Sequence, residues 1–219
     1  MRSSYLFAAL WGSLALMVFS PLHAADLSVV EKWMATNSGV SSVKISFAQT
    51  RTMRSIKVPI RQNGTLWMDY GRNRFRWETG IPTQTIVTKQ GSKLLIMRPI
   101  GKKYERRPFG SGGDNQGMSV MAGGFPRSMS EFKRKYRVIS TEKRNNTYRI
   151  VTQPLGSSGK GVSQFTFVVQ ASGYRMLGIE IDLKDGSSIN TVFNRVELNA
   201  SVPSSLFSPD LTGYKETKF

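Results

Sequence analysis

The chain has 219 residues, and 31 Lys and Arg against 14 Asp and Glu give it a formal net charge of +17 at pH 7. It has no cysteine and one histidine, His23, which excludes disulfides and removes the usual ligands of zinc and the usual groups of nucleophile–base catalysis. A high net charge indicates what a protein can bind and does not indicate its fold. A positive charge favours anionic lipid headgroups, lipopolysaccharide, acidic protein faces or nucleic acid as partners.

Residues 1–24 have the pattern of a cleavable secretory signal. Arg2 precedes an apolar run from Tyr5 to Phe19, and Leu22-His23-Ala24 ends in the small residue that signal peptidase prefers. The run of about 15 residues is shorter than the roughly 20 that a membrane span needs. We therefore predict cleavage after Ala24 and an exported, soluble protein of residues 25–219, a single domain that cannot be lipidated because it lacks cysteine.

The first half of residues 25–219 predicts one helix and an antiparallel meander. Apolar residues recur at helical spacing between Asp26 and Ser38, whereas Val43, Ile45 and Phe47 alternate with polar residues as in a half-buried strand. Strands are predicted at residues 43–53, 65–70, 74–78, 84–89, 93–97 and 102–107, with turns at Asn63-Gly64, at Gly71 to Asn73 and at Gln90-Gly91.

A glycine-rich segment from Gly110 to Arg127 separates the two halves and has no strand pattern. Ser128 to Glu131 fits a capping box, with Glu131 reaching back to the amide of Ser128, and predicts a short helix through Lys135. Further strands are predicted at residues 136–142, 148–153, 162–170, 175–183 and 188–198, before a tail from Pro203 that packs across the sheet as coil.

The predicted fold class is mainly β (α+β). About ten or eleven strands form a strongly curved antiparallel sheet or half-open barrel, because open sheets of that size curl. The two short helices are expected to cover the concave face and to leave an apolar cavity beneath them.

Several short motifs support a family resemblance, which is specific over residues 43–99. They are Ser46-Phe47-Ala48-Gln49, Gly64-Thr65-Leu66-Trp67-Met68, Asn73 to Glu78 and Gln84 to Val87, with weaker matches at Gln164-Phe165-Thr166 and Phe207-Ser208-Pro209. Their order resembles the periplasmic outer-membrane lipoprotein carrier family (LolA-like).

The resemblance implies a periplasmic carrier, expected to be a monomer, that shields the acyl chains of lipoproteins in an apolar cavity. Such a carrier receives its cargo from an ABC-type release complex of the inner membrane and delivers it to an outer-membrane acceptor. It needs no cofactor or metal. The alternatives are a carrier of a free lipid or glycolipid, and a basic envelope module that binds anionic surfaces.

The candidate cavity residues are apolar. Phe75 and Trp77 match the family's aromatic pair, although paired aromatics at period two are also typical of an ordinary core. Methionine suits an adaptable apolar site, and Trp67 is an alternative to its neighbours as the inward residue. The candidates are Phe47, Leu66, Met68, Phe75, Trp77, Ile86, Leu94, Ile96, Met118, Met121, Phe125 and Phe132.

The chain departs from the family pattern at the lid. Gly71 and Arg72 stand where the family has an Arg-Pro pair whose arginine holds the lid closed, so Arg72 or Arg74 is the candidate lid or rim residue. The strand with Leu95, Ile96 and Met97 lacks the family's aromatic residues. These departures favour a paralogue for a different amphiphile.

Basic clusters are either solvated or steer the protein to anionic membranes or to an acidic transporter face. Export argues against nucleic acid, and the carboxylates Asp182 and Asp185 are better explained by turn chemistry than by glycoside hydrolysis, so no enzymatic activity is expected. The clusters are Arg72, Arg74 and Arg76; Lys102, Lys103, Arg106 and Arg107; and Lys133, Arg134, Lys135 and Arg137.

Overall fold

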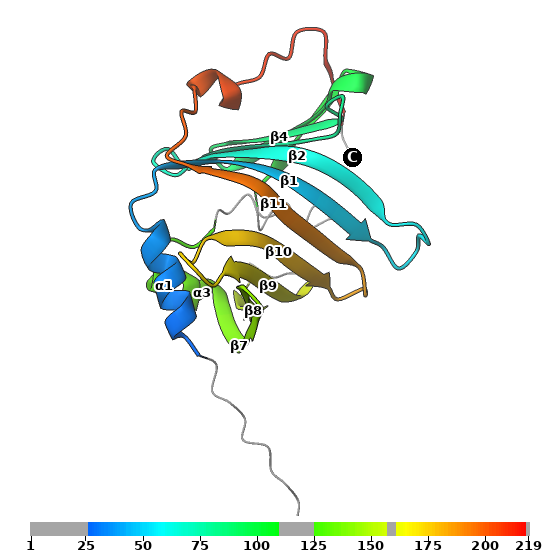
Figure 1. Ribbon diagram of the computed structural model, residues 1–219. Coiled ribbons are helices and arrows are strands. Elements are labelled where there is room, and N and C mark those ends of the chain that lie inside the picture. Colours follow the sequence, from blue (N-terminus) through cyan, green and yellow to red (C-terminus); the bar gives the residue numbers. More distant parts are fainter. Residues whose placement is uncertain (1–25, 110–124, 157–160, 218–219) are drawn as a thin grey trace, which may run out of the picture.

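The computed structural model describes residues 26–109, 125–156 and 161–217. Within them, a single strongly curved sheet of twelve strands dominates the structure (Figure 1). The strands are β1 (Ser42–Thr52), β2 (Ile60–Asp69), β3 (Arg74–Thr79), β4 (Thr85–Gln90), β5 (Lys93–Arg98), β6 (Lys103–Pro108), β7 (Tyr136–Arg144), β8 (Thr147–Pro154), β9 (Val162–Gln170), β10 (Met176–Leu183), β11 (Ser188–Leu198) and β12 (Lys215–Glu216). The mainly β, open antiparallel prediction is confirmed.

The order of strands in the sheet is β12-β6-β5-β4-β3-β2-β1-β11-β10-β9-β8-β7. From β6 to β7, all neighbouring pairs are antiparallel, and all except one join strands that are consecutive in sequence. The exception is β1 with β11, which pair from Val43 opposite Leu198 to Thr52 opposite Ser188. Two meanders are thus joined along one seam.

Two α-helices, α1 (Ser28–Asn37) and α3 (Met129–Lys135), lie together at one side of the sheet (Figure 1). The Ser128 hydroxyl caps α3 by accepting from the Glu131 N–H at 3.1 Å. The Glu131 carboxylate accepts instead from the N–H of Arg127, so the predicted reciprocal bond to Ser128 is not formed. No helix in the described ranges is long and apolar enough to cross a bilayer.

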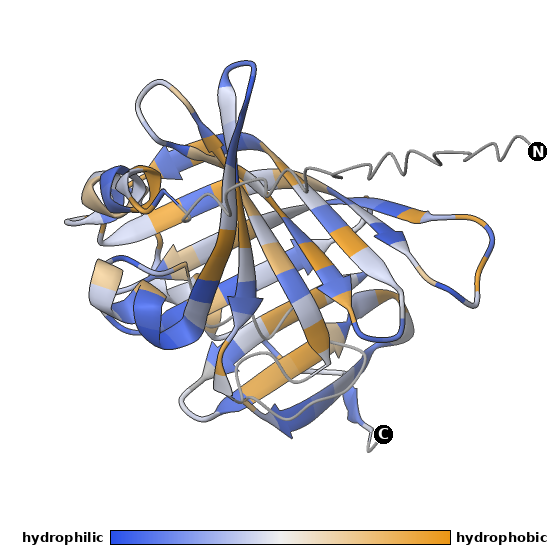
Figure 2. Ribbon diagram, turned by 90° about the horizontal axis from the view of Figure 1, so that it is seen from below, coloured by the Kyte–Doolittle hydropathy of each residue, from blue (hydrophilic) through white to orange (hydrophobic). Residues whose placement is uncertain are grey.

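Apolar and polar residues alternate along the strands, and the bands are visible in Figure 2. The apolar face of the sheet forms one large core cluster together with α1 and α3. Trp33 of α1 lies 5.0 Å from Phe167 of β9 and 6.1 Å from Phe132 of α3, measured between ring centroids. The rings of the two helices therefore pack on the β7–β9 part of the concave face.

A smaller apolar cluster lies on the opposite, convex face. It consists of Ile86, Leu95 and Met97, with Tyr104, Leu211 and Tyr214 packed against it. The tail reaches this face through the short 3₁₀ helix η3 (Ser204–Phe207) and ends in β12, which pairs parallel with β6. The tail was predicted as coil throughout, and its last strand is a correction.

Asn63-Gly64 was predicted as a turn and lies inside β2, where Gly64 pairs with Phe47 of β1. A Cβ on Gly64 would overlap the Phe47 ring and the backbone oxygen of Glu78. The glycine is therefore required for close packing: it leaves room for Phe47 to lie 4.1 Å from Trp77 between centroids.

Replacing Gly64 with alanine is expected to lower the free energy of unfolding by about 1–3 kcal/mol, because the new methyl group overpacks the core. Urea unfolding monitored by circular dichroism measures the change. Gly101→Ala is the matched control, since its Cβ would meet only side-chain atoms of Lys103 at 3.9 Å. Equal stability of the two variants would contradict the packing described for Gly64.

Candidate ligand-binding cavity

A cavity of about 470 Å³ lies between the end of α1 and the start of the β1–β11 seam. Its volume falls within the range of about 300–1,000 Å³ that is typical of small-molecule sites. Thr36, Asn37, Tyr70 and Gly173 are among the residues that line the cavity. The apolar lining is Val40, Val43, Ile45, Phe125, Met176, Phe193, Val196 and Leu198.

A β-bulge aims the β11 side chains at this cavity. Val43 and Ile45 alternate inward along β1 and pair with Leu198 and Val196. The register shifts between Ser46 and Phe47, so that Phe47 pairs with Phe193. Because the bulge inserts one extra residue, Phe193 and Val196 face the same side although they are three positions apart. Without the bulge, Val196 would point away from the cavity.

Two arginines also line the cavity. The Arg127 guanidinium lies 4.8 Å from the centroid of the Tyr70 ring and donates to the backbone oxygen of Val40 at 3.5 Å. It thereby joins the segment before α3 to the end of β2 and to the α1–β1 connection. Burial raises the pKa of Tyr70, which keeps its phenol neutral. Arg175 is exposed.

The structure brings most of the predicted cavity residues together, but in the core and not around the cavity. Phe47, Leu66, Met68, Phe75, Trp77, Leu94, Ile96, Phe125 and Phe132 all belong to the concave cluster, and only Phe125 lines the cavity. Leu66 and Met68 are buried on that face, whereas Trp67 is only half-buried. Phe132 packs against Trp33, Tyr136 and Phe167.

The prediction for Ile86 was wrong. Ile86 lies in the convex cluster with Leu95 and Met97, because the alternation along β4 turns its neighbour Val87 inward instead. Met118 and Met121 lie outside the described residues.

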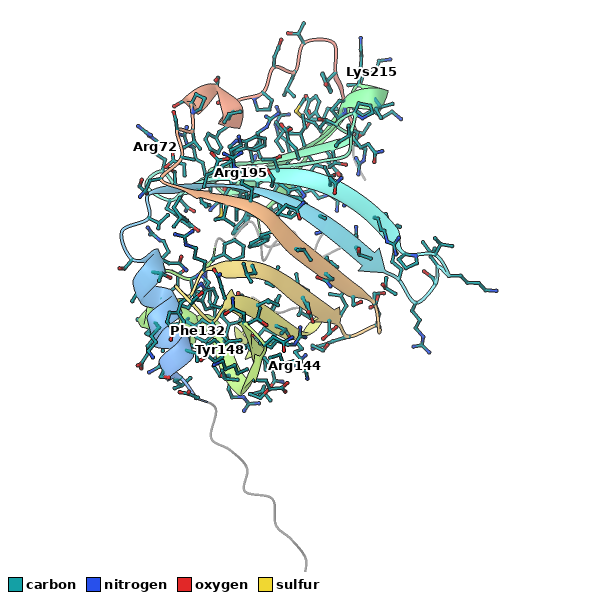
Figure 3. The ribbon with its side chains drawn as sticks, viewed as in Figure 1. Arg72, Phe132, Arg144, Tyr148, Arg195 and Lys215 are labelled. Atoms are coloured by element: carbon teal, nitrogen blue, oxygen red, sulfur yellow. The ribbon has the colours of Figure 1, made fainter. Side chains whose placement is uncertain are left out.

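Neither Arg72 nor Arg74 bonds to α1 or α3, the two α-helices of the described residues. Both bind Asp69: Arg74 Nη2 lies 2.6 Å from Asp69 Oδ2, and the backbone N–H of Arg72 donates to Asp69 Oδ1 at 3.0 Å. Arg74 also lies over the Phe207 ring of the tail, and Figure 3 shows Arg72 well away from Phe132 of α3. Arg127, which precedes α3, makes the contact to the end of β2 that was predicted for Arg72 or Arg74.

Asp69 is buried, with 6% of its surface exposed. Burial alone would raise the pKa of its carboxyl, but the hydrogen bonds from Arg74 and Arg72 outweigh it and hold that pKa below the usual value of 3.8. Because the pKa of Asp69 is lower in the folded than in the unfolded protein, the carboxylate contributes its full stabilisation at pH values above the unfolded-state pKa. This contribution is lost as the pH falls through the folded-state pKa.

Asp69→Asn is accordingly expected to lower the free energy of unfolding by about 2 kcal/mol at pH 7, the scale of hydrogen bonds to a charged group. The difference from the unmodified protein should shrink below about pH 4. Urea unfolding at several pH values measures it. Glu142→Gln, which removes an exposed carboxylate paired with Arg144, should cost less than about 1 kcal/mol, and a pH-independent loss for Asp69→Asn would refute the assignment.

Many residues of the predicted basic clusters have acidic partners. Arg76 pairs with Glu78 and also donates to the backbone oxygen of Leu206, which anchors the tail. Elsewhere, Asp185 accepts from the N–H of Ser187 in the β10–β11 turn, in line with the turn chemistry expected of it. Further pairs are Arg106 with Glu216, Arg107 with Glu105 and Lys135 with Glu131.

The sequence patterns did not lead to one buried cation, Lys89. Lys89 is buried on β4, donates to Asn73 Oδ1 at 2.8 Å and lies 4.5 Å from the centroid of the Phe109 ring. Burial lowers its pKa, and the nearby charge of Lys135 adds to this effect. The sequence pattern could have predicted its burial, because Lys89 lies two positions after Val87 on the same strand and so faces the same, inward side.

An open, curved antiparallel sheet with a partly apolar cavity between its concave side and a helix defines the half-barrel class of proteins. The chain belongs to the family described as outer membrane lipoprotein carrier protein LolA, which matches residues 38–210. The resemblance predicted from the sequence motifs is therefore confirmed.

Solved structures resemble this one at low sequence identity, and one of them has a TM-score above 0.5. An uncharacterized conserved protein from Thermus thermophilus has a TM-score of 0.53 at 6% identity, over 87% of this chain and 96% of that one. A LolA superfamily protein from Nitrosomonas europaea has a TM-score of 0.45 at 12% identity over 84% and 97%, and the Mycobacterium tuberculosis lipoprotein LppX has 0.46 at 13% over 81% and 96%. A comparison with curated protein sequences found no match.

Proposed function

We propose that this protein is a periplasmic carrier, without catalytic activity, that shields the acyl chains of a lipoprotein or a related amphiphile between the inner and the outer membrane. The cavity carries the proposal. It is lined mainly by aliphatic and aromatic side chains, and it lies on the concave face between α1 and the seam. Membership of the lipoprotein carrier family supports the same function.

The arginines favour one second candidate, a free lipid with an anionic headgroup. Arg127 and Arg175 line the same cavity as Val43 and Ile45, so an acyl chain inside would place a carboxylate or phosphate within reach of a guanidinium. Arg127 is already engaged with Tyr70 and Val40. Arg175 makes no ion pair with a described carboxylate and is the group available to such a ligand.

The test is equilibrium binding of three fluorescent probes to the purified, delipidated protein: a fatty acid, its methyl ester and a lipidated peptide. Saturable binding of any of them supports a carrier, and binding of none overturns the proposal. A preference for the peptide identifies lipoprotein cargo, whereas a preference for the fatty acid identifies a free lipid. Native mass spectrometry of protein purified from its host then identifies the bound molecule.

For the free-lipid candidate, Arg175→Ala is expected to weaken fatty-acid binding about tenfold, since a hydrogen bond between charged groups is lost. Binding of the uncharged methyl ester should not change. Arg195→Ala is the matched control, because it removes one exposed positive charge from a residue that pairs with Glu197 and does not line the cavity. If both variants weaken the fatty acid equally, the effect is one of net charge and not of a headgroup site.

A further inference from the structure

We propose that the loop between β1 and β2 docks the protein onto bilayers that contain anionic lipids. The loop and the strand ends beside it, residues 53–61, are called the β1–β2 tip below. This proposal does not depend on what the cavity binds.

The β1–β2 tip exposes apolar side chains close together. Ile56, Val58 and Ile60 are 43%, 73% and 43% exposed, so three large apolar residues lie within five positions. Single exposed apolar residues are common on protein surfaces, whereas clustered ones mark sites of protein or membrane interaction.

Basic residues alternate with these apolar ones. Arg54, Lys57 and Arg61 are exposed, and no described carboxylate pairs with any of them. The sequence has no Asp or Glu between Lys44 and Met68. The tip therefore keeps its positive charge directly beside its exposed apolar side chains. An apolar surface edged by free cations is complementary to a bilayer with negative headgroups.

The tip extends beyond the end of β3. Pairing of β2 with β1 runs out to Ile60 opposite Arg51, whereas pairing of β2 with β3 stops at Gly64. Figure 1 shows this hairpin projecting at the end of the sheet away from α1, Figure 2 shows its mixed hydropathy, and long side chains extend from it in Figure 3.

The projecting loop is also anchored. Ile56 N–H donates to the backbone oxygen of Met53 at 3.1 Å, and Arg54 N–H donates to the Ser187 hydroxyl of the β10–β11 turn at 3.3 Å. An anchored turn loses less conformational entropy on binding than a free loop. It can therefore present its apolar side chains to a membrane at low entropic cost.

The experiment is co-sedimentation of the purified protein with vesicles of equimolar phosphatidylglycerol and phosphatidylcholine, compared with vesicles of phosphatidylcholine alone. We expect binding to the anionic vesicles that weakens as salt is raised. The apolar variant Ile56→Ser/Val58→Ser/Ile60→Ser is expected to bind at least tenfold more weakly. The charge variant Arg54→Ser/Lys57→Ser/Arg61→Ser should lose about a hundredfold, because each cation near an anionic surface contributes about fivefold.

Two controls separate the tip from the net charge of the molecule. Lys133→Ser/Arg144→Ser/Arg195→Ser removes three positive charges elsewhere, and Val192→Ser removes an exposed apolar residue of β11. The charge control should lose much less vesicle affinity than the charge variant, and Val192→Ser much less than the apolar variant. The proposal fails if the charge control loses as much vesicle affinity as the charge variant. It also fails if the tip variants bind vesicles as the unmodified protein does, and the exposed tip would then be a candidate site for a protein partner. Thermal unfolding followed by circular dichroism verifies that every variant folds, whatever the cavity binds.

Discussion

Replacing Val196 with tryptophan is expected to weaken binding of a fluorescent fatty acid at least tenfold. Val196 is half-buried, lines the cavity and pairs with Ile45 across the seam. The larger side chain would occupy space that an acyl chain otherwise fills. Each methylene group denied burial costs about 0.8 kcal/mol, so excluding two or three of them is enough for a tenfold loss or more.

The control is the same substitution four residues earlier on the same strand. Val192 is exposed, pairs with Ala48 and does not line the cavity. Val192→Trp should therefore bind the fatty acid as the unmodified protein does. Fluorescence titration measures both affinities, and thermal unfolding verifies that both variants fold. Equal affinities would place the acyl site elsewhere on the molecule.

Replacing Trp33 with alanine is expected to lower the free energy of unfolding by about 3–5 kcal/mol, the cost typical of removing a buried aromatic side chain. Trp33 is 0% exposed and is the contact of α1 with Phe167 of the sheet and Phe132 of α3. Losing the ring leaves a void shared by both helices and β9. For a chain of this size the melting temperature should fall by roughly 10 °C.

A second substitution separates the ring from its polar atom. The indole Nε1 of Trp33 is buried and has no hydrogen-bond partner among the described residues. Trp33→Phe keeps most of the apolar contact and removes this unsatisfied donor. Urea unfolding should show that Trp33→Phe lowers the free energy of unfolding by less than half as much as Trp33→Ala does. An equal loss would mean that the aromatic contacts do not hold α1 in place.

Much of the fold could be predicted because its strands are short, regular and joined mostly by local turns. Val43, Ile45 and Phe47 alternate in sequence and are all buried on the concave side. Gly64 shows where that reasoning failed. An Asn-Gly pair is a strong turn signal, but here the glycine is needed by the Phe47 ring, which comes from another strand. No local pattern contains that contact.

The candidate site was harder to predict than the fold. The motif that identified the family led to Phe75 and Trp77, which are buried in the core next to the cavity and do not line it. Val196 could not be found by counting, because the bulge opposite Ser46 and Phe47 reverses the facing of every later residue of β11. Arg127 and Tyr70 meet only after the segment before α3 packs onto the end of β2.

The seam between β1 and β11 has a consequence for how the chain folds. All the other antiparallel pairs form between consecutive strands, so each meander can assemble from its own hairpins. Closing the seam fixes a loop of roughly 135 residues at an entropic cost of about 4 kcal/mol, and non-local pairings of this kind slow folding. We therefore expect the seam to form last. Until it does, β1 and β11 are open edges, and those two strands are where an unfinished chain would pair with a second copy and aggregate.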